Sequence, residues 1–355
     1  MIPKKTAIKH SLPNYSVDFS DVKGQAHAKR AIEIAAAGGH NILLSGSPGT
    51  GKSMLAQRIP TILPPLLEQE IIDTTKVYSV AGVTPEGGSY VKHRPFRAPH
   101  HTISDAGLLG GGSNISPGEV SLAHNGVLFL DEFPEFRKSS LESMRQLLED
   151  RKITISRASG TLTFPSQFML VAAMNPCPCG YKGDPKVSCS CFDRQLESYE
   201  NRLSGPILDR IDIQIDVPRV DYSEFRKETN EESSAIIRDR VVNARRIQYK
   251  RYKNFGDRGR SNAEASPKAM EEFCKLDEGS HQILERMMVK FGYSGRAHNR
   301  ILKVARTIAD LEGVEAIGKA HLMEAVQYRS RDRSSGQVQE RKVTHIGKQY
   351  SLKVS

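Results

Sequence analysis

One octapeptide decides the fold of this chain, Gly46-Ser47-Pro48-Gly49-Thr50-Gly51-Lys52-Ser53. It follows an apolar run at 41–44 and precedes a helix-like segment at 54–59, the context in which G-x-x-x-x-G-K-[ST] forms a phosphate-binding loop (P-loop). Its glycines let successive backbone N–H groups point at phosphate oxygens, beside the amino end of a helix. We expect Lys52 to reach the β- and γ-phosphates of a nucleotide and the Ser53 hydroxyl to ligate Mg²⁺. A Gly/Pro turn with a chance lysine is the weaker interpretation.

A second motif supplies acidic groups for the same site. The sequence at 127–132 reads Val-Leu-Phe-Leu-Asp-Glu, a short apolar run of the kind that forms a buried parallel strand. Asp131, at the carboxyl end of that strand, could hold Mg²⁺ beside Ser53. Glu132 is then placed to polarise a water for attack on the γ-phosphate. An isolated Asp-Glu pair would more simply open a surface turn before Pro134, but its position after a P-loop predicts hydrolysis of a nucleoside triphosphate.

Composition indicates a globular protein with two domains. The chain has 355 residues, of which 38% are hydrophobic and 26% charged. It contains no apolar run near the ~20 residues that span a bilayer, and its basic start lacks the apolar region of a secretory signal. Five cysteines beside a P-loop make a disulfide framework improbable. We therefore expect a cytoplasmic protein without membrane contact.

Positive charge is concentrated in the second half of the chain. Of the net charge of +10, +8 follows Val220, where 27 Lys and Arg face 19 Asp and Glu. Residues 241–260 alone carry seven cations and one anion. Such a run indicates either a solvated helix face or contact with an anionic polymer, whose phosphates would supply most of the binding energy.

Strand and helix patterns alternate in the first part of the chain. An extended leader at 1–20 precedes Ser20 and Asp21, which we expect to cap a helix at 26–37. Alternation of apolar strands with helices predicts a doubly wound α/β core at 21–218, with a parallel sheet. The expected strands lie at 41–45, 126–130, 168–173 and 211–217.

The rest of the chain reads as helical, and the core contains insertions. Residues 219–330 predict a smaller all-α lid domain, and residues 331–355 a basic flexible tail. The expected lid helices lie at 231–252, 267–276, 280–291, 297–311 and 319–328. A long irregular insertion at 79–125 is rich in Gly, His, Pro and Ser, which indicates a functional loop. Alternation around Ser159-Gly160 predicts a β-hairpin at 151–165, with Arg151, Lys152 and Arg157 near its tip or stems.

With these motifs in view, the chain resembles the AAA+ ATPases of the magnesium-chelatase-like group, and most closely the ComM/YifB competence-protein family. The resemblance runs from about residue 16 to 330 and is carried by five segments, at 38–53, 94–102, 122–132, 171–180 and 205–212. Its His-His pair at 100–101 and its Cys-Pro-Cys-Gly at 177–180 are more specific than the P-loop. Members of the family usually carry an N-terminal domain resembling the Lon protease fold. Only about twenty residues precede the ATPase core here, so we expect a shortened version or a fragment.

The resemblance implies roles for three further residues. Asn175 matches the polar sensor that helps to orient the attacking water, a task suited to an amide that both donates and accepts. Arg210 matches the arginine finger of the related MCM-type ATPases, which completes the site of a neighbouring subunit. Arg296 matches the second sensor arginine. Nearby competitors for these arginine roles are Arg202, Arg300 and Arg306. A finger supplied in trans implies a ring, which in this superfamily is usually a hexamer.

The cysteines pose a separate question. Cys177, Cys179, Cys189 and Cys191 form two Cys-x-Cys pairs, which suit a structural tetrahedral Zn²⁺, with reduced and unliganded thiols as the alternative. Cys274 reads as a core residue. For the histidines at 100, 101 and 124 we expect hydrogen-bonding or loop-structural roles, because no carboxylate has convincing ligand spacing.

These features together predict an ATP-driven motor that acts on DNA. The expected activity is translocation or branch migration by a hexameric ring during recombination or natural transformation, with ATP and Mg²⁺ as cofactors. Such a helicase-like motor would bind single-stranded or branched DNA through its phosphates and without sequence preference. The alternative is a magnesium-chelatase-type motor subunit that remodels a metal-inserting partner. Lys52, Asp131 and Glu132 are all present, which argues against a non-catalytic nucleotide-binding scaffold.

Overall fold

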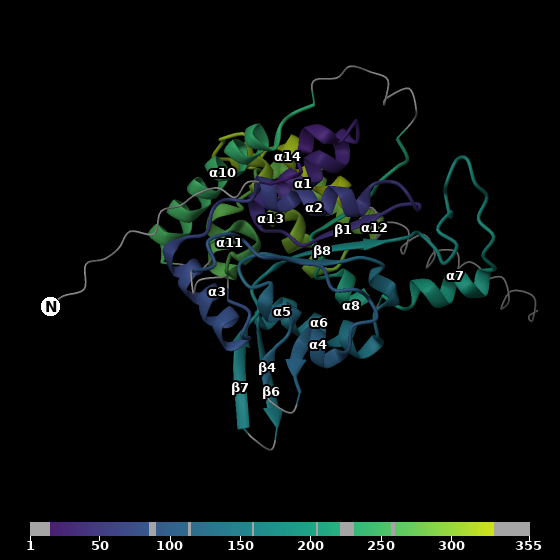
Figure 1. Cartoon of the computed structure of the whole chain (residues 1–355). Helices are drawn as coiled ribbons and strands as arrows, with labels where there is room; N and C mark the ends of the chain where they lie inside the picture. Colours follow the sequence, from purple (N-terminus) through teal and green to yellow (C-terminus); the bar gives the residue numbers. More distant parts are fainter. Residues whose placement is uncertain are drawn as a thin grey trace, which may run out of the picture.

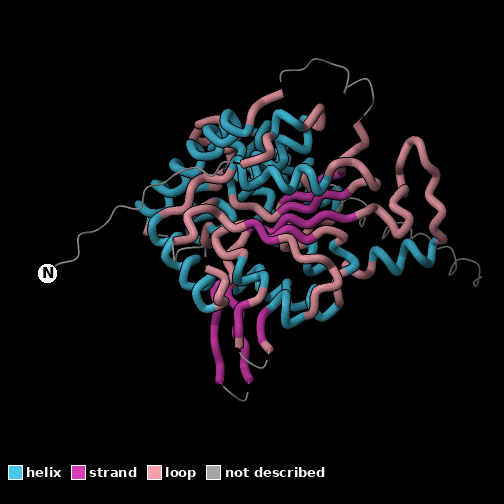
Figure 2. The backbone as a smooth tube through the Cα atoms, viewed as in Figure 1, coloured by secondary structure: helices cyan, strands magenta, loops and turns pink. Residues whose placement is uncertain are grey.

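The computed structural model describes residues 15–84, 90–112, 115–157, 160–203, 205–220, 231–256 and 260–329. A five-stranded sheet lies at the centre of these residues, with helices on both faces (Figure 1, Figure 2). The doubly wound α/β core expected from the sequence is confirmed. Most of the leader at 1–20 and all of the tail at 331–355 lie outside the described residues.

All strands of the central sheet are parallel, in the order β2-β5-β8-β1-β9. Four of them match the predicted strands, namely β1 (Ile42–Ser45), β5 (Val127–Leu130), β8 (Met169–Met174) and β9 (Ile213–Asp216). The edge strand β2 (Phe96–Arg97) was not predicted, because two residues carry no periodic pattern. Parallel strands end together, so the segments that follow β1, β8 and β5 meet at one edge of the sheet.

Strand side chains alternate between two hydrophobic clusters. Ile42 and Leu44 face the cluster that contains α1 (Ala26–Gly38) and α2 (Lys52–Ile62), whereas Leu43 faces the opposite cluster. The second cluster includes residues of α4 (Asp105–Leu109), α5 (Glu119–Leu122), η3 (Phe133–Glu135), α6 (Lys138–Asp150) and α8 (Gly205–Leu208). Because both faces are covered, the strands read as continuous apolar runs.

The C-terminal helices pack on the same face as α1 and α2. They are α10 (Ser234–Phe255), η4 (Asn262–Glu264), α11 (Pro267–Phe273), α12 (Glu278–Phe291), α13 (Gly295–Leu311) and α14 (Lys319–Gln327). In Figure 1, α10, α13 and α14 lie with α1 on the upper side of the sheet. Core and C-terminal helices share one hydrophobic cluster, in which Ala35 and Ile32 of α1 join Val241 of α10 and Val304 of α13.

A buried polar contact also ties the helical region to the sheet. The Nδ1 atom of His40, which is fully buried, lies 3.2 Å from Asp212 Oδ2, and its Nε2 atom lies 2.7 Å from Thr307 Oγ1 on α13. Arg300 of α13 pairs with Asp212 Oδ1 at 2.7 Å. Burial lowers the pKa of His40, and Asp212 opposes that shift. Although burial acts to raise it, Arg300 and His40 hold the pKa of Asp212 well below its usual range.

Two insertions form one projection below the sheet. The predicted hairpin is confirmed as β6 (Lys152–Arg157) paired with β7 (Gly160–Pro165). The segment at 79–125, expected to be irregular, contains the end of α3 (Glu68–Val80), the strand β2, the helices α4 and α5, and the small pair β3 (Gly110–Gly111) and β4 (Ser116–Pro117). A Cβ on Gly110 would lie 2.7 Å from Ile155 Cδ1, so β3 packs against the hairpin. Figure 1 shows β4, β6 and β7 projecting on the same side.

The helix predicted at 26–37 forms as α1, but the cap expected for it was wrong. Helix α1 begins after Gln25, which has a left-handed backbone with φ of 54°, and its side chain does not cap the helix. Ser20 and Asp21 belong to the short turn η1 (Phe19–Asp21), which Asp18 caps. The helix α7 (Asp193–Glu200) completes the elements, at the right of Figure 1.

His40→Ala should destabilise the chain, because Asp212 and Thr307 each lose a buried hydrogen-bond partner. We expect the free energy of unfolding to fall by about 1–3 kcal/mol, measured by urea denaturation. His281→Ala on the exposed face of α12 is the control and should leave the midpoint unchanged. Equal midpoints for the two variants would contradict a structural role for His40.

Candidate nucleotide-binding site

The P-loop connects the end of β1 to the start of α2, as the sequence predicted. Gly49 and Gly51 have φ of 77° and 84°, a backbone region that residues with a Cβ rarely adopt. Gly46 is required for a different reason, since a Cβ there would lie 2.5 Å from the carbonyl oxygen of Val217. The loop therefore curls tightly around the amino end of α2.

The Lys52 side chain lies inside this curl. Its Nζ atom donates to the carbonyl oxygens of Gly46 at 2.6 Å and Ser47 at 3.0 Å, and to Asn175 Oδ1 at 3.3 Å. Burial lowers the pKa of Lys52, and the nearby Asp131 opposes that shift. The structure thus brings the P-loop lysine together with Asn175, which follows β8 directly.

Ser53 and Asp131 are also in contact. The Ser53 hydroxyl donates to Asp131 Oδ2 at 2.6 Å, and Asp131 Oδ1 accepts from the backbone N–H of Glu132 at 2.9 Å. A hydroxyl and a carboxylate are hard oxygen ligands of the kind that Mg²⁺ takes. These two side chains therefore fit the magnesium site that the sequence predicted.

Glu132 has a partner that the sequence did not reveal. Its carboxylate, 51% exposed, lies with Oε2 2.8 Å from His101 Nδ1. The backbone of Glu132 is left-handed, with φ of 51°, an uncommon conformation that occurs often at functional sites. His100 does not share this contact, since its Nδ1 lies 2.9 Å from Thr102 Oγ1. We expected hydrogen-bonding or loop-structural roles for both histidines, without a particular partner for either. The contact depends on β2 lying beside β5, and that pairing was not evident from the sequence.

Gln25 is a second residue that sequence reasoning missed. Its Nε2 atom donates to the carbonyl oxygen of Thr50 at 2.6 Å, so the entry to α1 holds the P-loop from outside. The left-handed conformation of Gln25 aims its side chain at this carbonyl. No local pattern in the sequence distinguishes such a residue from an ordinary helix-start glutamine.

The predicted arginines lie away from the P-loop of their own chain. Arg210 is 4% exposed, and its guanidinium pairs with Glu149 of α6 and donates to the Pro206 carbonyl. Arg296 is exposed in the first turn of α13, where it makes no hydrogen bond or ion pair with the described residues. Arg300, one turn later, pairs with Asp212 just before β9, at the sheet edge opposite the P-loop.

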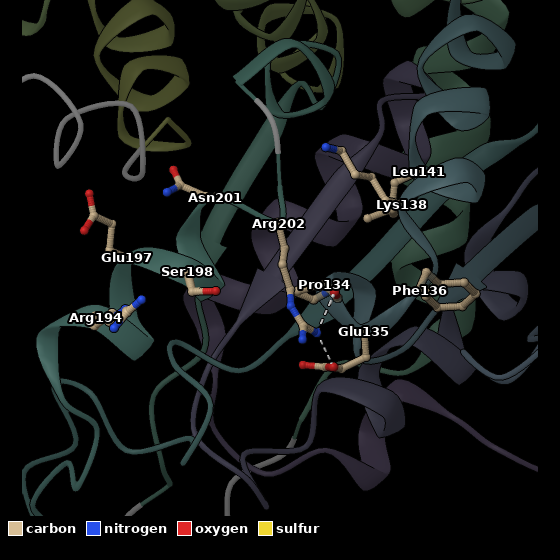
Figure 3. A pocket seen from close by; sticks show the side chains of 10 residues that line it. All are labelled: Pro134, Glu135, Phe136, Lys138, Leu141, Arg194, Glu197, Ser198, Asn201 and Arg202. Atoms are coloured by element: carbon tan, nitrogen blue, oxygen red, sulfur yellow. Dashed lines mark hydrogen bonds and ion pairs between the residues drawn. The ribbon is translucent and has the colours of Figure 1, made fainter.

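Of the three competing arginines, Arg202 lies on an open groove of about 640 Å³ (Figure 3). It pairs with Glu135, which belongs to η3 just beyond Glu132. Figure 3 also shows Lys138 and Arg194 on this groove, so cations from α6 and α7 line it. Arg306, in contrast, is buried and bonds Asp310 and backbone carbonyls near the end of α13.

The basic run at 241–260 is only partly turned to solvent. Arg245 donates to the Ala36 carbonyl, Arg251 pairs with Asp310, and Arg260 pairs with Glu70. These three cations therefore serve the packing of α10 and its neighbours. Arg246, Lys250 and Lys253 are exposed, and Arg258 lies outside the described residues.

The four clustered cysteines converge as expected. The sulfurs of Cys177, Cys179, Cys189 and Cys191 lie within 4.8 Å of one another. Three of the sulfur–sulfur distances are 3.4, 3.7 and 3.5 Å. Sulfurs at about 2.3 Å from a tetrahedral Zn²⁺ lie roughly 3.8 Å apart, so the cluster fits that ion. Backbone N–H groups of Tyr181 and Ser190 lower the pKa of Cys179 to about 5. Although backbone N–H groups oppose the change, burial and the neighbouring thiols raise the pKa values of Cys189 and Cys191, so Cys179 carries the thiolate most readily. Cys274, the residue that ends α11, is buried, as expected for a core residue.

His124 lies apart from the nucleotide site. Its Nδ1 atom accepts from the Gln167 backbone N–H at 3.2 Å, and burial lowers its pKa to about 4. A neutral imidazole in this position joins the loops that precede β5 and β8.

Among the helices in the described part of the chain, we find none that is both long and apolar enough to cross a membrane.

Comparison with known proteins shows the family to which the chain is related. Residues 18–225 match the family described as magnesium chelatase, subunit ChlI, and residues 231–329 match magnesium chelatase, subunit ChlI C-terminal. The chain is 46% identical over 330 residues to the competence protein ComM of Haemophilus influenzae, which covers 93% of this chain and 63% of the relative. It is 43% identical over 323 residues to YifB of Salmonella typhimurium, covering 90% of this chain and 62% of that protein.

A more distant similarity covers part of the chain. It is 27% identical over 207 residues to the DNA replication licensing factor Mcm2 of Drosophila melanogaster, which is 54% of this chain and 20% of that protein. The chain spans less than two thirds of the length of ComM and YifB. The resemblance to the magnesium-chelatase-like AAA+ proteins and to ComM and YifB is thus confirmed. The chain belongs to the magnesium chelatase subunit ChlI family of AAA+ ATPases.

Proposed function

We propose that this chain is the ATP-hydrolysing subunit of a ring-shaped motor that acts on DNA. The observation that carries the proposal is the meeting of Lys52, Ser53, Asp131 and Asn175 at one edge of the sheet. ATPases of this family supply the reaction class, and the relatives named for competence and for DNA replication licensing supply the substrate class. A cytoplasmic site of action, expected from the sequence, is part of the same proposal.

Each residue of the site has a physical task in this proposal. The backbone N–H groups of the P-loop, which Pro48 lacks, and the Lys52 ammonium would bind phosphate oxygens, and Ser53 with Asp131 would hold Mg²⁺. The ion supplies charge neutralisation for the phosphates when it is bound. Glu132 accepts a proton from the attacking water, and Asn175 orients that water. His101 holds the Glu132 carboxylate in place through its Nδ1 contact.

The ring is proposed because the arginines do not reach their own P-loop. Arg210 would serve as the finger of a neighbouring site after leaving Glu149, and Arg296 would reach a neighbour from the exposed start of α13. A guanidinium there would stabilise charge on the transferring phosphoryl group. Head-to-tail contacts of this kind close into rings, and a hexamer is the expected size.

The proposed DNA contact is the projection made by β3, β4, β6 and β7. The hairpin strands are largely exposed, and Lys152 and Arg157 point cations to solvent on them. Cations on a protruding hairpin bind phosphates rather than bases, which fits a motor that moves along single-stranded or branched DNA of any sequence. The activities that we propose are translocation and branch migration, which would make the chain a helicase-like DNA motor.

We further propose that the cysteine cluster binds one structural Zn²⁺. The sulfur separations fit tetrahedral coordination, and backbone N–H groups donate to the sulfurs. Cys179 N–H donates to Cys191 Sγ and Lys182 N–H to Cys177 Sγ, each at 3.3 Å. Such bonds stabilise the thiolates that a metal requires.

A magnesium-chelatase-type motor subunit is the second candidate. The family match over residues 18–225 favours it, because that family is named for the chelatase subunit. In that case ATP hydrolysis would remodel a partner that inserts Mg²⁺ into a porphyrin. Partner-dependent metal insertion, with no effect of DNA on the ATPase, would favour this candidate over the DNA motor.

DNA should bind the chain and raise its rate of ATP hydrolysis. We would measure ATPase activity and DNA affinity with single-stranded, duplex and four-way-junction DNA between 50 and 200 mM salt. Over this range, binding through about six or more phosphate contacts weakens by about 10³-fold or more. Replacing both Lys152 and Arg157 by Ala should weaken binding and reduce the salt slope by about 2.

The matched control replaces Lys268 and Lys290, which are exposed on α11 and α12, by Ala. It removes the same amount of positive charge and should change neither the DNA affinity nor its dependence on salt. Absence of binding and of stimulation by all three DNA forms at low salt would overturn the DNA motor.

Mixing two inactive variants should restore activity if Arg210 acts in trans. The Lys52→Ala subunit has an inactive P-loop but keeps Arg210 for its neighbour. The Arg210→Ala subunit keeps its P-loop but offers no arginine finger to its neighbour. Each alone should lose ATPase activity by about 10³-fold, whereas an equal mixture should recover roughly a quarter of the sites. The same mixing with Arg202→Ala is the comparison. Recovery with that variant, and none with Arg210→Ala, would assign the finger to Arg202.

His101→Ala should slow hydrolysis by about tenfold, the effect of a 1.4 kcal/mol rise in the barrier, because Glu132 loses the contact that holds it. Nucleotide affinity should stay unchanged, since neither side chain belongs to the P-loop. His100→Ala removes the adjacent ring without touching Glu132 and should leave kcat near the wild-type value. Equal kcat for the two histidine variants would show that the His101 contact has no part in hydrolysis.

A further inference from the structure

The segment after Asn175 has no secondary structure of its own. We define the cysteine loop as residues 176–192, between β8 and α7. Within it only Cys177 and Gly180 are buried as whole residues, so it has no apolar core to order it. A loop of this length without such a core needs cross-links to order it, and a metal ion bound by the four sulfurs would supply them.

The cysteine loop nevertheless packs directly on the P-loop. Gly180 lies against Pro48 so closely that a Cβ on it would be 2.6 Å from Pro48 Cδ. Asp184, whose side chain is 1% exposed, pairs at 2.7 Å with Arg219, which follows β9. Hydrogen bonds from the Lys186 backbone and from Ser47 lower the pKa of Asp184. Two positions of the loop therefore contact the segment that is proposed to bind phosphate.

The same loop begins at the proposed sensor. Asn175 Oδ1 accepts from Lys52 Nζ, and its backbone carbonyl accepts from the Tyr199 hydroxyl of α7 at 3.1 Å. Cys177 follows two residues later and is fully buried, with its sulfur 3.4 Å from that of Cys179. Lys182 joins the loop to Glu200 at the end of α7 by an ion pair of 2.6 Å. The cysteine loop thus begins directly after Asn175, and α7, to which the loop leads, holds the Asn175 carbonyl.

We propose that the metal-bound cysteine loop is a positioning element for ATP hydrolysis, which holds Asn175 at Lys52 and Gly180 against Pro48. This inference rests on the proposed ATPase and zinc site, and it assigns the loop a task beyond local folding. Gly180 and Asp184 are positioning residues, because they act through the P-loop and do not touch the reacting atoms. A misplacement of about 1 Å at a reacting centre can slow a reaction by about 10²-fold.

Two glycines of the loop provide a matched test that leaves every cysteine in place. Gly180 and Gly183 both have left-handed backbones, with φ of 87° and 80°, but a Cβ on Gly183 meets no atom within 4 Å. Gly180→Ala should therefore lower kcat by at least about tenfold, whereas Gly183→Ala should stay within about twofold of wild type. Zinc content, measured by mass spectrometry of the full chain, should remain one ion per chain for both variants.

Removal of the metal is the second test of the positioning role. Treatment with a chelator, or Cys189→Ser with Cys191→Ser, should release the zinc and lower kcat by a similar factor, with a smaller change in nucleotide affinity. Added Zn²⁺ should restore kcat in the chelated wild type but not in the serine variant. Replacing Pro48 by Ala in the Gly180→Ala background should recover part of kcat, because it makes room for the new methyl group.

The outcomes separate this inference from the proposals on which it rests. A wild-type chain that hydrolyses no ATP would remove the proposed function, and a chain without bound zinc would remove the metal site. An active zinc protein in which chelation leaves kcat unchanged would overturn the positioning role alone. Equal loss of kcat in Gly180→Ala and Gly183→Ala would also overturn it, since strain common to both glycines would then explain the effect.

Discussion

The hydrogen bond from Ser53 to Asp131 joins the P-loop to the acidic end of β5. The rest of the nucleotide site depends on the parallel strand order that brings these two segments together. The two residues are far apart in the chain, yet their side chains meet at 2.6 Å. They meet because β1, β8 and β5 are parallel neighbours, so that the segments leaving their carboxyl ends share one edge. A parallel sheet needs covered faces, and both hydrophobic clusters are therefore part of the site's construction.

Contacts from outside the sheet hold the P-loop as well. Gln25 bonds the Thr50 carbonyl from the entry of α1, and Gly180 of the cysteine loop lies against Pro48. At the opposite edge of the sheet, His40 and Asp212 connect the strands to α13 of the helical region. The nucleotide site and the C-terminal helices are thus attached to opposite ends of the same strands. A displacement of either end would be transmitted through a packed core that deforms little.

Sequence reasoning worked where a short motif has a mechanism of its own. The P-loop, the strand before Asp131 and Glu132, and the hairpin at 151–165 each follow local rules, and the structure places them as predicted. It failed at β2, whose two residues have no periodicity, and consequently at the contact between His101 and Glu132. The cap expected before α1 was wrong for a related reason, because Asp18 and Asp21 form the capping box of the short turn η1. The sequence could not separate the cations of the basic run at 241–260 that pair with other residues of the fold from those that face solvent. Both kinds are Lys or Arg on one segment, and only their partners in the structure distinguish them.

Residue types and spacing alone determined that this chain has a P-loop, an acidic strand end, a helical C-terminal region and two close cysteine pairs. These features depend on interactions between near neighbours in the chain, which local sequence records. Only the tertiary structure decided that His101 touches Glu132, that Arg210 is buried against Glu149, and that the cysteine loop lies on Pro48. Each of those contacts joins segments that are distant in sequence, and the packing of strands and loops selects them rather than any pattern within one segment.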